Sequence, residues 1–152
     1  MKRLTLLLSI AAMLTISACS RSYMPGDFYS EGGLKGIVVT ADEQGKPTLL
    51  LAPEETKGVT AAEAKEWVES YGDGGWHLPT KEEMEQVKKY KTLINKTLEQ
   101  KKQPVVLTNH TFYWTSTPCS ESHTYACGPD GLHCYFSTNN SPYYRGRGVS
   151  EM

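Results

Sequence analysis

Thiol and imidazole groups gather in the C-terminal third of the chain, where they could form a disulfide, a zinc site or a redox pair. Three cysteines and three histidines lie there: Cys119, Cys127, Cys134, His110, His123 and His133. Their spacing does not suit zinc, because no Cys-x-x-Cys pair occurs and seven positions separate Cys127 from Cys134. We therefore expect no metal, and histidines that lie at the surface.

The turn between the last two cysteines bears on which pair is oxidised. Gly-Pro-Asp-Gly at 128–131 is a turn sequence, because proline sets φ and glycine admits positive φ. If its two central residues form the corner, Cys127 faces Leu132 and lies diagonal to Cys134, with Cβ atoms about 7 Å apart, too far for a disulfide. This geometry favours a disulfide between Cys119 and Cys134, with one spare thiol. A register shifted by one residue would reverse that preference.

Aromatic and cationic side chains near the C-terminus are the candidates for ligand recognition. Eight of the fifteen aromatic residues fall between positions 112 and 144. Their rings suit sugars or protein surfaces, although alternate rings on short strands could equally fill a core. Adjacent residues on a strand face opposite ways, so one tyrosine of the Tyr143-Tyr144 pair should be exposed. The predicted ligand-binding residues are Tyr143, Tyr144, Arg145, Arg147 and Asn139.

Other chemistries find little support. No Gly-x-Ser-x-Gly elbow and no acidic pair for glycoside cleavage stand out, so we expect no enzyme and no cofactor. Asn139-Asn140 offers amide oxygens without carboxylates, which is a weak calcium site. Seven lysines lie between Lys81 and Lys102, interleaved with four glutamates. This pattern indicates a solvated helix face, with a lipid- or glycan-binding stripe as the alternative.

The elements that must position these residues begin with a hairpin and a helix. Residues 27–33 are turn-rich, and apolar runs at 34–39 and 48–51 flank an Asp-Glu-Gln-Gly turn, which predicts a β-hairpin with a solvated tip. Thr60 and Glu63 form a capping box, after which apolar residues recur at helical spacing until Gly72.

A second helix start lies in the stretch 75–83. Trp76 and Leu78 bracket a polar residue in strand-like alternation, and Pro79 cannot continue a ladder. Thr80 and Glu83 then form another capping box, and helical spacing continues until Pro104. Strands are predicted at 105–107, 112–117, 125–127, 132–136 and 143–149. This order predicts an α+β fold with two helices packed on short antiparallel sheets.

Three sequence stretches resemble one known family. Trp76-x-Leu78-Pro79-Thr80-x-x-Glu83, a Tyr-Trp-Thr-Ser-Thr run that contains Trp114, and Arg-Gly-Arg-Gly-Val at 145–149 are similar to the bacterial extracytoplasmic domains named after the C-terminal domain of a collagen-like adhesin, and to the related major-paralogous-domain proteins. The resemblance covers residues 26–149 and implies a C-type-lectin-like fold. The family pattern has Arg after the Trp, where this chain has His77.

The resemblance also bears on function. The sugar-binding motifs Glu-Pro-Asn, Gln-Pro-Asp and Trp-Asn-Asp are missing from this chain. The formylglycine-generating oxidases, which share the lectin-like core, have closer cysteine spacing than Cys127 and Cys134 and a longer chain. The expectation is therefore a non-catalytic binding or adhesion module for an unidentified glycan or envelope protein, acting through its C-terminal loops. The alternatives are an accessory subunit of a surface fibre or envelope assembly and, third, an enzyme related to these oxidases.

The N-terminus predicts a lipoprotein. Lys2 and Arg3 precede an apolar run of about a dozen residues, too short for a membrane-spanning helix, and Ile-Ser-Ala-Cys at 16–19 is a lipoprotein box. We expect a signal peptide at 1–18, acyl chains such as palmitate on Cys19, a tether at 19–26 and one domain at 27–152. Ser20, rather than Asp, favours the outer membrane.

The charge of the mature chain limits its partners. Removing two basic residues leaves (16 − 2) − 17 = −3. A nucleic-acid partner is not expected, because it would require a basic face. The expected partners are the membrane, through the N-terminal lipid, and a glycan or an envelope protein.

Overall fold

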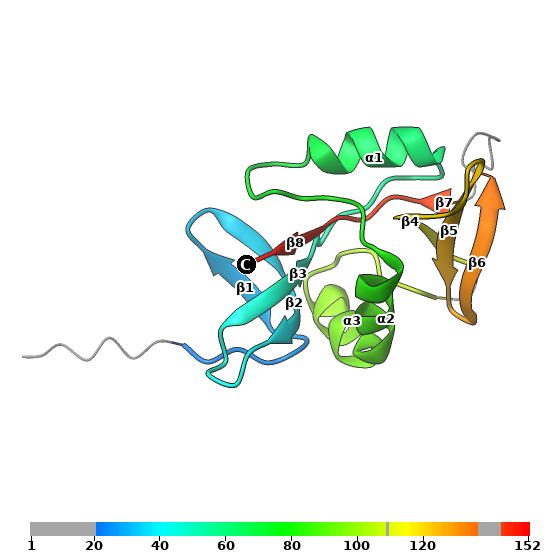
Figure 1. Ribbon diagram of the computed structural model, residues 1–152. Helices are drawn as coiled ribbons and strands as arrows, with labels where there is room; N and C mark the ends of the chain where they lie inside the picture. Colours follow the sequence, from blue (N-terminus) through cyan, green and yellow to red (C-terminus); the bar gives the residue numbers. More distant parts are fainter. Residues whose placement is uncertain (1–20, 109, 137–143) are drawn as a thin grey trace, which may run out of the picture.

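Two four-stranded sheets and three helices make up the computed structural model, which describes residues 21–108, 110–136 and 144–152 apart from the side chains of 134–136 (Figure 1). The predicted α+β class is confirmed. In chain order the elements are β1 Phe28–Glu31, β2 Leu34–Ala41, β3 Pro47–Leu51, α1 Ala61–Glu69, α2 Lys81–Lys89, α3 Lys91–Gln100, β4 Phe112–Ser120, β5 His123–Gly128, β6 Gly131–Phe136, β7 Tyr144–Arg145 and β8 Val149–Glu151.

The first sheet joins the two ends of the described chain. Its order is β1-β2-β3-β8 and every pairing is antiparallel. The predicted hairpin is β2 and β3, and the Asp42 carboxylate closes its turn by accepting from the backbone N–H groups of Gln44 and Lys46 at 2.9 and 2.8 Å. The expectation of turns at 27–33 was wrong for β1, because pairing with β2 draws residues 28–31 into the sheet.

The second sheet carries the predicted C-terminal strands in the order β6-β5-β4-β7. β4, β5 and β6 are antiparallel, whereas β7 runs parallel to β4. At the β5–β6 turn Gly128 faces Gly131 and Cys127 faces Leu132. The predicted turn and its register are therefore confirmed.

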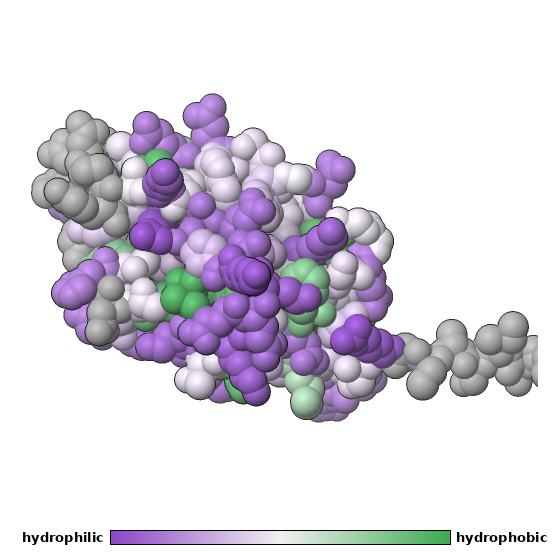
Figure 2. Space-filling view, turned by 180° about the vertical axis from the view of Figure 1, so that it is seen from behind, coloured by the Kyte–Doolittle hydropathy of each residue, from purple (hydrophilic) through white to green (hydrophobic). Residues whose placement is uncertain are grey.

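The helices pack against both sheets, with α1 on one side of the molecule and α2 and α3 on the other (Figure 1). Each predicted capping box is formed, by Thr60 and Glu63 on α1 and by Thr80 and Glu83 on α2. One buried cluster joins the apolar residues of α2 and α3 to β2 and β3, and a second joins α1 to Trp76, Leu78 and Trp114. On the face seen in Figure 2 most residues are hydrophilic, and the hydrophobic ones form small separate patches.

The prediction of one continuous helix after Thr80 was wrong. Two helices follow instead, so the described residues form three helices where the sequence predicted two. The chain leaves helical geometry at Tyr90, whose φ and ψ are −103° and 14°, and α3 begins at the next residue.

Two of the strands predicted from the sequence also differ from those in the structure. Residues 105–107 form no strand: the Asn95 side chain bonds both the N–H and the C=O of Val106, at 2.8 and 2.9 Å, in place of a neighbouring strand. The strand predicted at 143–149 is divided between β7 and β8, which belong to different sheets. Between β7 and β8 the chain passes close to α1 and Trp76. Gly146 and Gly148 permit this close approach, because a Cβ atom at either position would lie too near these neighbours.

The segment before β1 is part of the fold. Tyr23 is buried and its N–H donates to the carbonyl of Gly45 at 2.8 Å, while the N–H of Gly26 donates to Val38 at 2.7 Å. The predicted tether at 19–26 therefore includes residues that belong to the domain. Across the described ranges, no helix has both the length and the apolar character needed to cross a membrane.

Candidate functional site

The segment 76–83 connects the first sheet to α2. His77 forms a two-sided backbone bridge with Val149, at 3.0 and 2.9 Å, which leaves Trp76 and Leu78 buried and His77 half-buried. The predicted alternation is thus present. At Thr80 the direction changes: its hydroxyl accepts from the Glu83 N–H at 3.1 Å, and Glu83 Oε2 accepts from the Thr80 N–H at 2.7 Å.

The same glutamate holds the His77 ring. Nε2 of His77 lies 3.2 Å from Glu83 Oε1, and Nδ1 lies 3.3 Å from the carbonyl oxygen of Gly75. Both partners are acceptors, so the ring donates to each only when both nitrogens carry protons. The carboxylate therefore serves the helix cap with one oxygen and the imidazole with the other.

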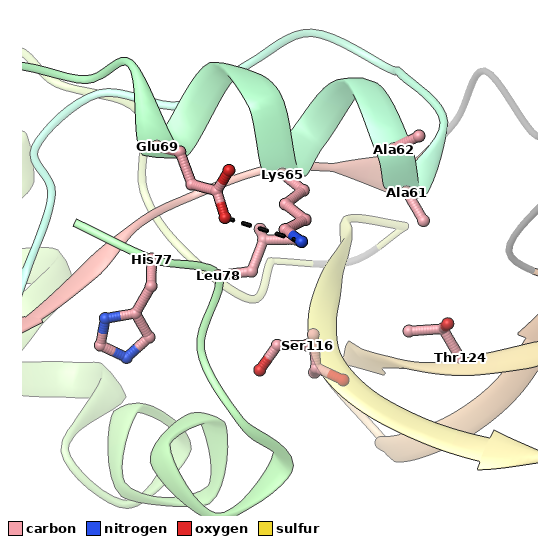
Figure 3. Close-up of a pocket in the computed structure, with 9 residues that line it drawn as sticks. Ala61, Ala62, Lys65, Glu69, His77, Leu78, Ser116 and Thr124 are labelled. Atoms are coloured by element: carbon pink, nitrogen blue, oxygen red, sulfur yellow. Dashed lines mark ion pairs between the residues drawn. The ribbon is translucent and has the colours of Figure 1, made fainter. Parts of the chain in front are cut away.

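A cleft of about 410 Å³, here called the α1 cleft, lies between α1, residues 77–78 and the second sheet. Its lining residues are Ala61, Ala62, Lys65, Glu69, His77, Leu78, Thr115, Ser116 and Thr124. In Figure 3, Lys65 and Glu69 reach from α1 toward Leu78, and Ser116 approaches from β4. Lys65 and Glu69 form a largely exposed ion pair at 3.8 Å.

Several polar groups of this cleft contact neighbouring residues. The His77 ring nitrogens contact Glu83 and Gly75. Thr115 is buried, and its hydroxyl donates to the carbonyl of Tyr125 at 2.7 Å. The cleft therefore offers polar groups around an apolar floor, the usual composition of a ligand site.

Arg147, predicted as a ligand contact, lies instead inside the protein. Its side chain is 1% exposed. Nη2 donates to Glu55 Oε2 at 2.8 Å and to the carbonyl of Pro104 at 2.6 Å, and the guanidinium lies 5.8 Å from the ring centre of Tyr113. The side chain is therefore enclosed by the protein, and its role in ligand binding stays a prediction.

Glu55 is the centre of this buried cluster. Its side chain is 3% exposed, and it pairs with Arg145 through Oε1 and with Arg147 through Oε2. The Tyr113 hydroxyl donates to Oε2 at 2.5 Å. Burial raises the pKa of Tyr113 far above 10; the Glu55 charge adds to the rise, and Arg147 opposes it. No motif pointed to Glu55, which is 90 residues from Arg145 in sequence.

The guanidinium of Arg147 is incompletely paired. Its Nε and Nη1 atoms are buried without a hydrogen-bond partner among the described residues. An unsatisfied buried donor costs stability, so this side chain depends on Glu55 for its charge compensation.

Tyr144 belongs to a cluster of aromatic rings. It is half-buried, with its ring 4.9 Å from that of Trp114 in an edge-on arrangement and 5.6 Å from that of Phe112. Trp114 is buried and its Nε1–H donates to the carbonyl of Val59 at 2.8 Å, as suits a structural residue. Two other predicted ligand contacts, Tyr143 and Asn139, lie outside the described residues.

The cysteines fall into different environments. Cys127 is free and buried, and burial raises the pKa of its thiol, which disfavours the reactive thiolate. Cys119 is disulfide-bonded. The side chain of Cys134 and the whole of Cys19 lie outside the described part, so the Cys119–Cys134 pairing and the lipidation stay predictions.

The histidines near the cysteines contact neighbouring polar groups. His133 Nε2 lies 3.2 Å from Asp130, whose pKa is lowered chiefly by that hydrogen bond, and His123 Nδ1 lies 2.8 Å from the Ser120 hydroxyl. Among the residues that the structure describes, no three His, Cys, Asp or Glu side chains gather as a metal site would require.

Comparison with known proteins brings no further assignment. No family model matches the chain, and no curated protein matches it either.

Proposed function

We propose that this protein is a non-catalytic binding or adhesion module of the bacterial cell envelope, anchored to the outer membrane through acyl chains on Cys19. The ligand, a glycan or a segment of an envelope protein, occupies the α1 cleft. The observation that carries the proposal is the cleft itself, which combines an apolar floor at Leu78 with Ser116, His77 and the Lys65–Glu69 pair.

The α1 cleft is a different binding surface from the C-terminal loops that the sequence predicted. Arg147 is buried, and Arg145 is paired with the buried Glu55 carboxylate, so both cations are engaged within the protein. β4 and β5 still take part, because Ser116 and Thr124 line the α1 cleft.

The finer fold assignment, a C-type-lectin-like domain, is part of the same proposal. Its support is that the three stretches that carry the resemblance meet in space. His77 pairs with Val149, which joins the first stretch to the last. The N–H of Ser116 donates to the carbonyl of Pro79 at 2.9 Å, which joins the first stretch to the second.

A binding screen tests the proposed function. The mature chain with Cys19→Ser, which lacks the acylation site, is applied to arrayed glycans and to envelope and matrix proteins, with calcium and with chelator. We expect specific binding that Ala62→Phe abolishes, because a ring at this exposed position of α1 fills the cleft.

The matched control is Glu66→Phe. Glu66 is exposed on the same helix but lines a different hollow, beside Trp67 and Ser70, so this variant should keep full binding. Binding that survives Ala62→Phe would place the ligand elsewhere on the domain. No binding by a folded sample would favour the role of an accessory subunit.

A further inference from the structure

A groove runs between α3 and the segment that enters the fold from the N-terminus. This groove, here called the N-terminal groove, has a volume of about 440 Å³ and is lined by residues 24–27 on one side and by Tyr90, Leu93 and Lys96 on the other. The Thr97 hydroxyl donates to the carbonyl of Gly26 at 2.5 Å. A Cβ added to Gly26 would lie 2.7 Å from the Cβ of Leu93, so glycine permits this close approach.

The walls of the groove carry exposed apolar side chains. Met24 is 67% exposed and Leu93 is 48% exposed. Among the described residues, the third large hydrophobic with such exposure is Met152. Two of the three therefore lie in one groove, and exposed apolar side chains that lie together mark interaction surfaces better than isolated ones do.

Lysines lie in the groove and beside it. Lys96 lines it, and the Lys89 ammonium lies 5.1 Å from the ring centre of Tyr90, another lining residue. Between positions 88 and 102 the sequence has six lysines and one glutamate. The three other glutamates of the stretch 81–102 lie earlier, in the first half of α2. The acidic Asp27 also lines the groove, where its carboxylate accepts from the Met24 N–H at 2.9 Å.

The position of the groove along the chain limits its distance from the proposed lipid. Met24 follows Cys19 by 24 − 19 = 5 residues, and five fully extended residues span at most about 18 Å. The hydrogen bonds of Tyr23 and Gly26 fix the end of this segment to the domain. If Cys19 carries acyl chains in a bilayer, the N-terminal groove must therefore lie close to the membrane surface.

We propose that the N-terminal groove is a membrane-docking surface that rests on anionic phospholipid. Met24 and Leu93 enter the boundary between head groups and acyl chains, and Lys89 and Lys96 face the lipid phosphates. The proposal rests on the lipid anchor within the proposed function. Because α1 and α3 lie on opposite sides of the molecule in Figure 1, this docking turns the α1 wall of the cleft away from the bilayer.

Vesicle binding by the unacylated chain tests the surface without the anchor. A chain from residue 19 with Cys19→Ser retains every contact described above, since these contacts begin at Tyr23. It is sedimented with vesicles of phosphatidylcholine, with or without phosphatidylglycerol. We expect partition into the anionic vesicles, and a loss of about tenfold for Leu93→Ser combined with Lys96→Glu. Circular dichroism verifies that the variants fold.

The control is Lys57→Glu, which makes the same change of charge at an exposed site beside a different hollow. It should lower the partition by less than about threefold, the size of a general charge effect. Equal losses for the two variants, or no preference for anionic vesicles, would overturn the proposal. Mass spectrometry of the native N-terminal peptide tests the anchor separately: absence of acyl chains contradicts lipidation, whereas the vesicle result concerns the groove alone.

Discussion

Glu55 determines what the two C-terminal arginines do. It is a buried carboxylate between two guanidinium groups, one buried and one 40% exposed. Removing a buried partner leaves the remaining charge without compensation, whereas an exposed partner is largely replaced by water. The same Arg-Gly-Arg sequence thus contains one arginine on which the fold depends and one that contributes much less.

A pair of substitutions separates these roles. Arg147→Leu should lower the free energy of unfolding by about 3–5 kcal/mol, because the buried Glu55 carboxylate loses its fully buried cationic partner. Arg145→Leu should cost about 1 kcal/mol or less, because water screens its half-exposed guanidinium. Urea unfolding at neutral pH measures both. A fully stable Arg147→Leu protein with impaired ligand binding would support the role that the sequence predicted for this residue.

At the scale of elements, the two capping boxes fix the N-terminal ends of α1 and α2. On α1 the Glu63 carboxylate accepts from the backbone N–H and from the hydroxyl of Thr60, at 2.8 and 2.9 Å. These two bonds, the backbone one first, lower the pKa of Glu63 below its usual 4.5. Since α1 forms one wall of the proposed binding cleft, its N-terminal cap also helps to shape the candidate site.

The lowered pKa predicts a pH dependence of stability. The charged form is favoured in the folded state, so its stabilising effect is present above pH 4.5 and is lost as the pH falls through the folded-state pKa. Glu63→Gln should therefore be less stable than the wild type at neutral pH, and the difference should shrink below pH 4.5. Urea midpoints over this range test it, with Glu66→Gln as the control on the same helix. A difference that stays constant with pH would rule out this cap as the cause.

At the scale of the whole molecule, both ends of the described chain complete the first sheet and its surroundings. β8 pairs with β3, and Tyr23 packs beside Tyr29 of β1, with ring centres 5.3 Å apart. The N-terminal segment therefore stabilises the domain and also brings it close to the proposed anchor.

Truncation tests this structural role. A chain that begins at Asp27 should unfold at lower urea than one that begins at Arg21. The expected loss is roughly 2–3 kcal/mol, because the buried Tyr23 side chain is removed. Hydrogen exchange should show faster opening near Gly45 and Val38, which lose their hydrogen-bond donors. Equal stability of the two chains would restore the predicted tether at 19–26.

Sequence alone predicted the features that arise from contacts between near neighbours. The capping boxes at Thr60 and Thr80, the turn at 128–131 and its register each involve residues a few positions apart, so side-chain type and spacing are sufficient to indicate them. The alternation of Trp76 and Leu78 belongs to the same class, because a buried face of an extended segment repeats every second residue.

Only the tertiary structure decided the features that depend on distant partners. Residues 28–31 become a strand because β2 pairs with them, and Val106 stays outside a sheet because Asn95 satisfies its backbone. Arg147 is buried because Glu55, 92 residues away, supplies the opposite charge, and the α1 cleft exists because α1 lies across β4. Burial and charge pairing depend on where the chain folds back on itself, and the spacing of residues along one segment carries no information on that partner.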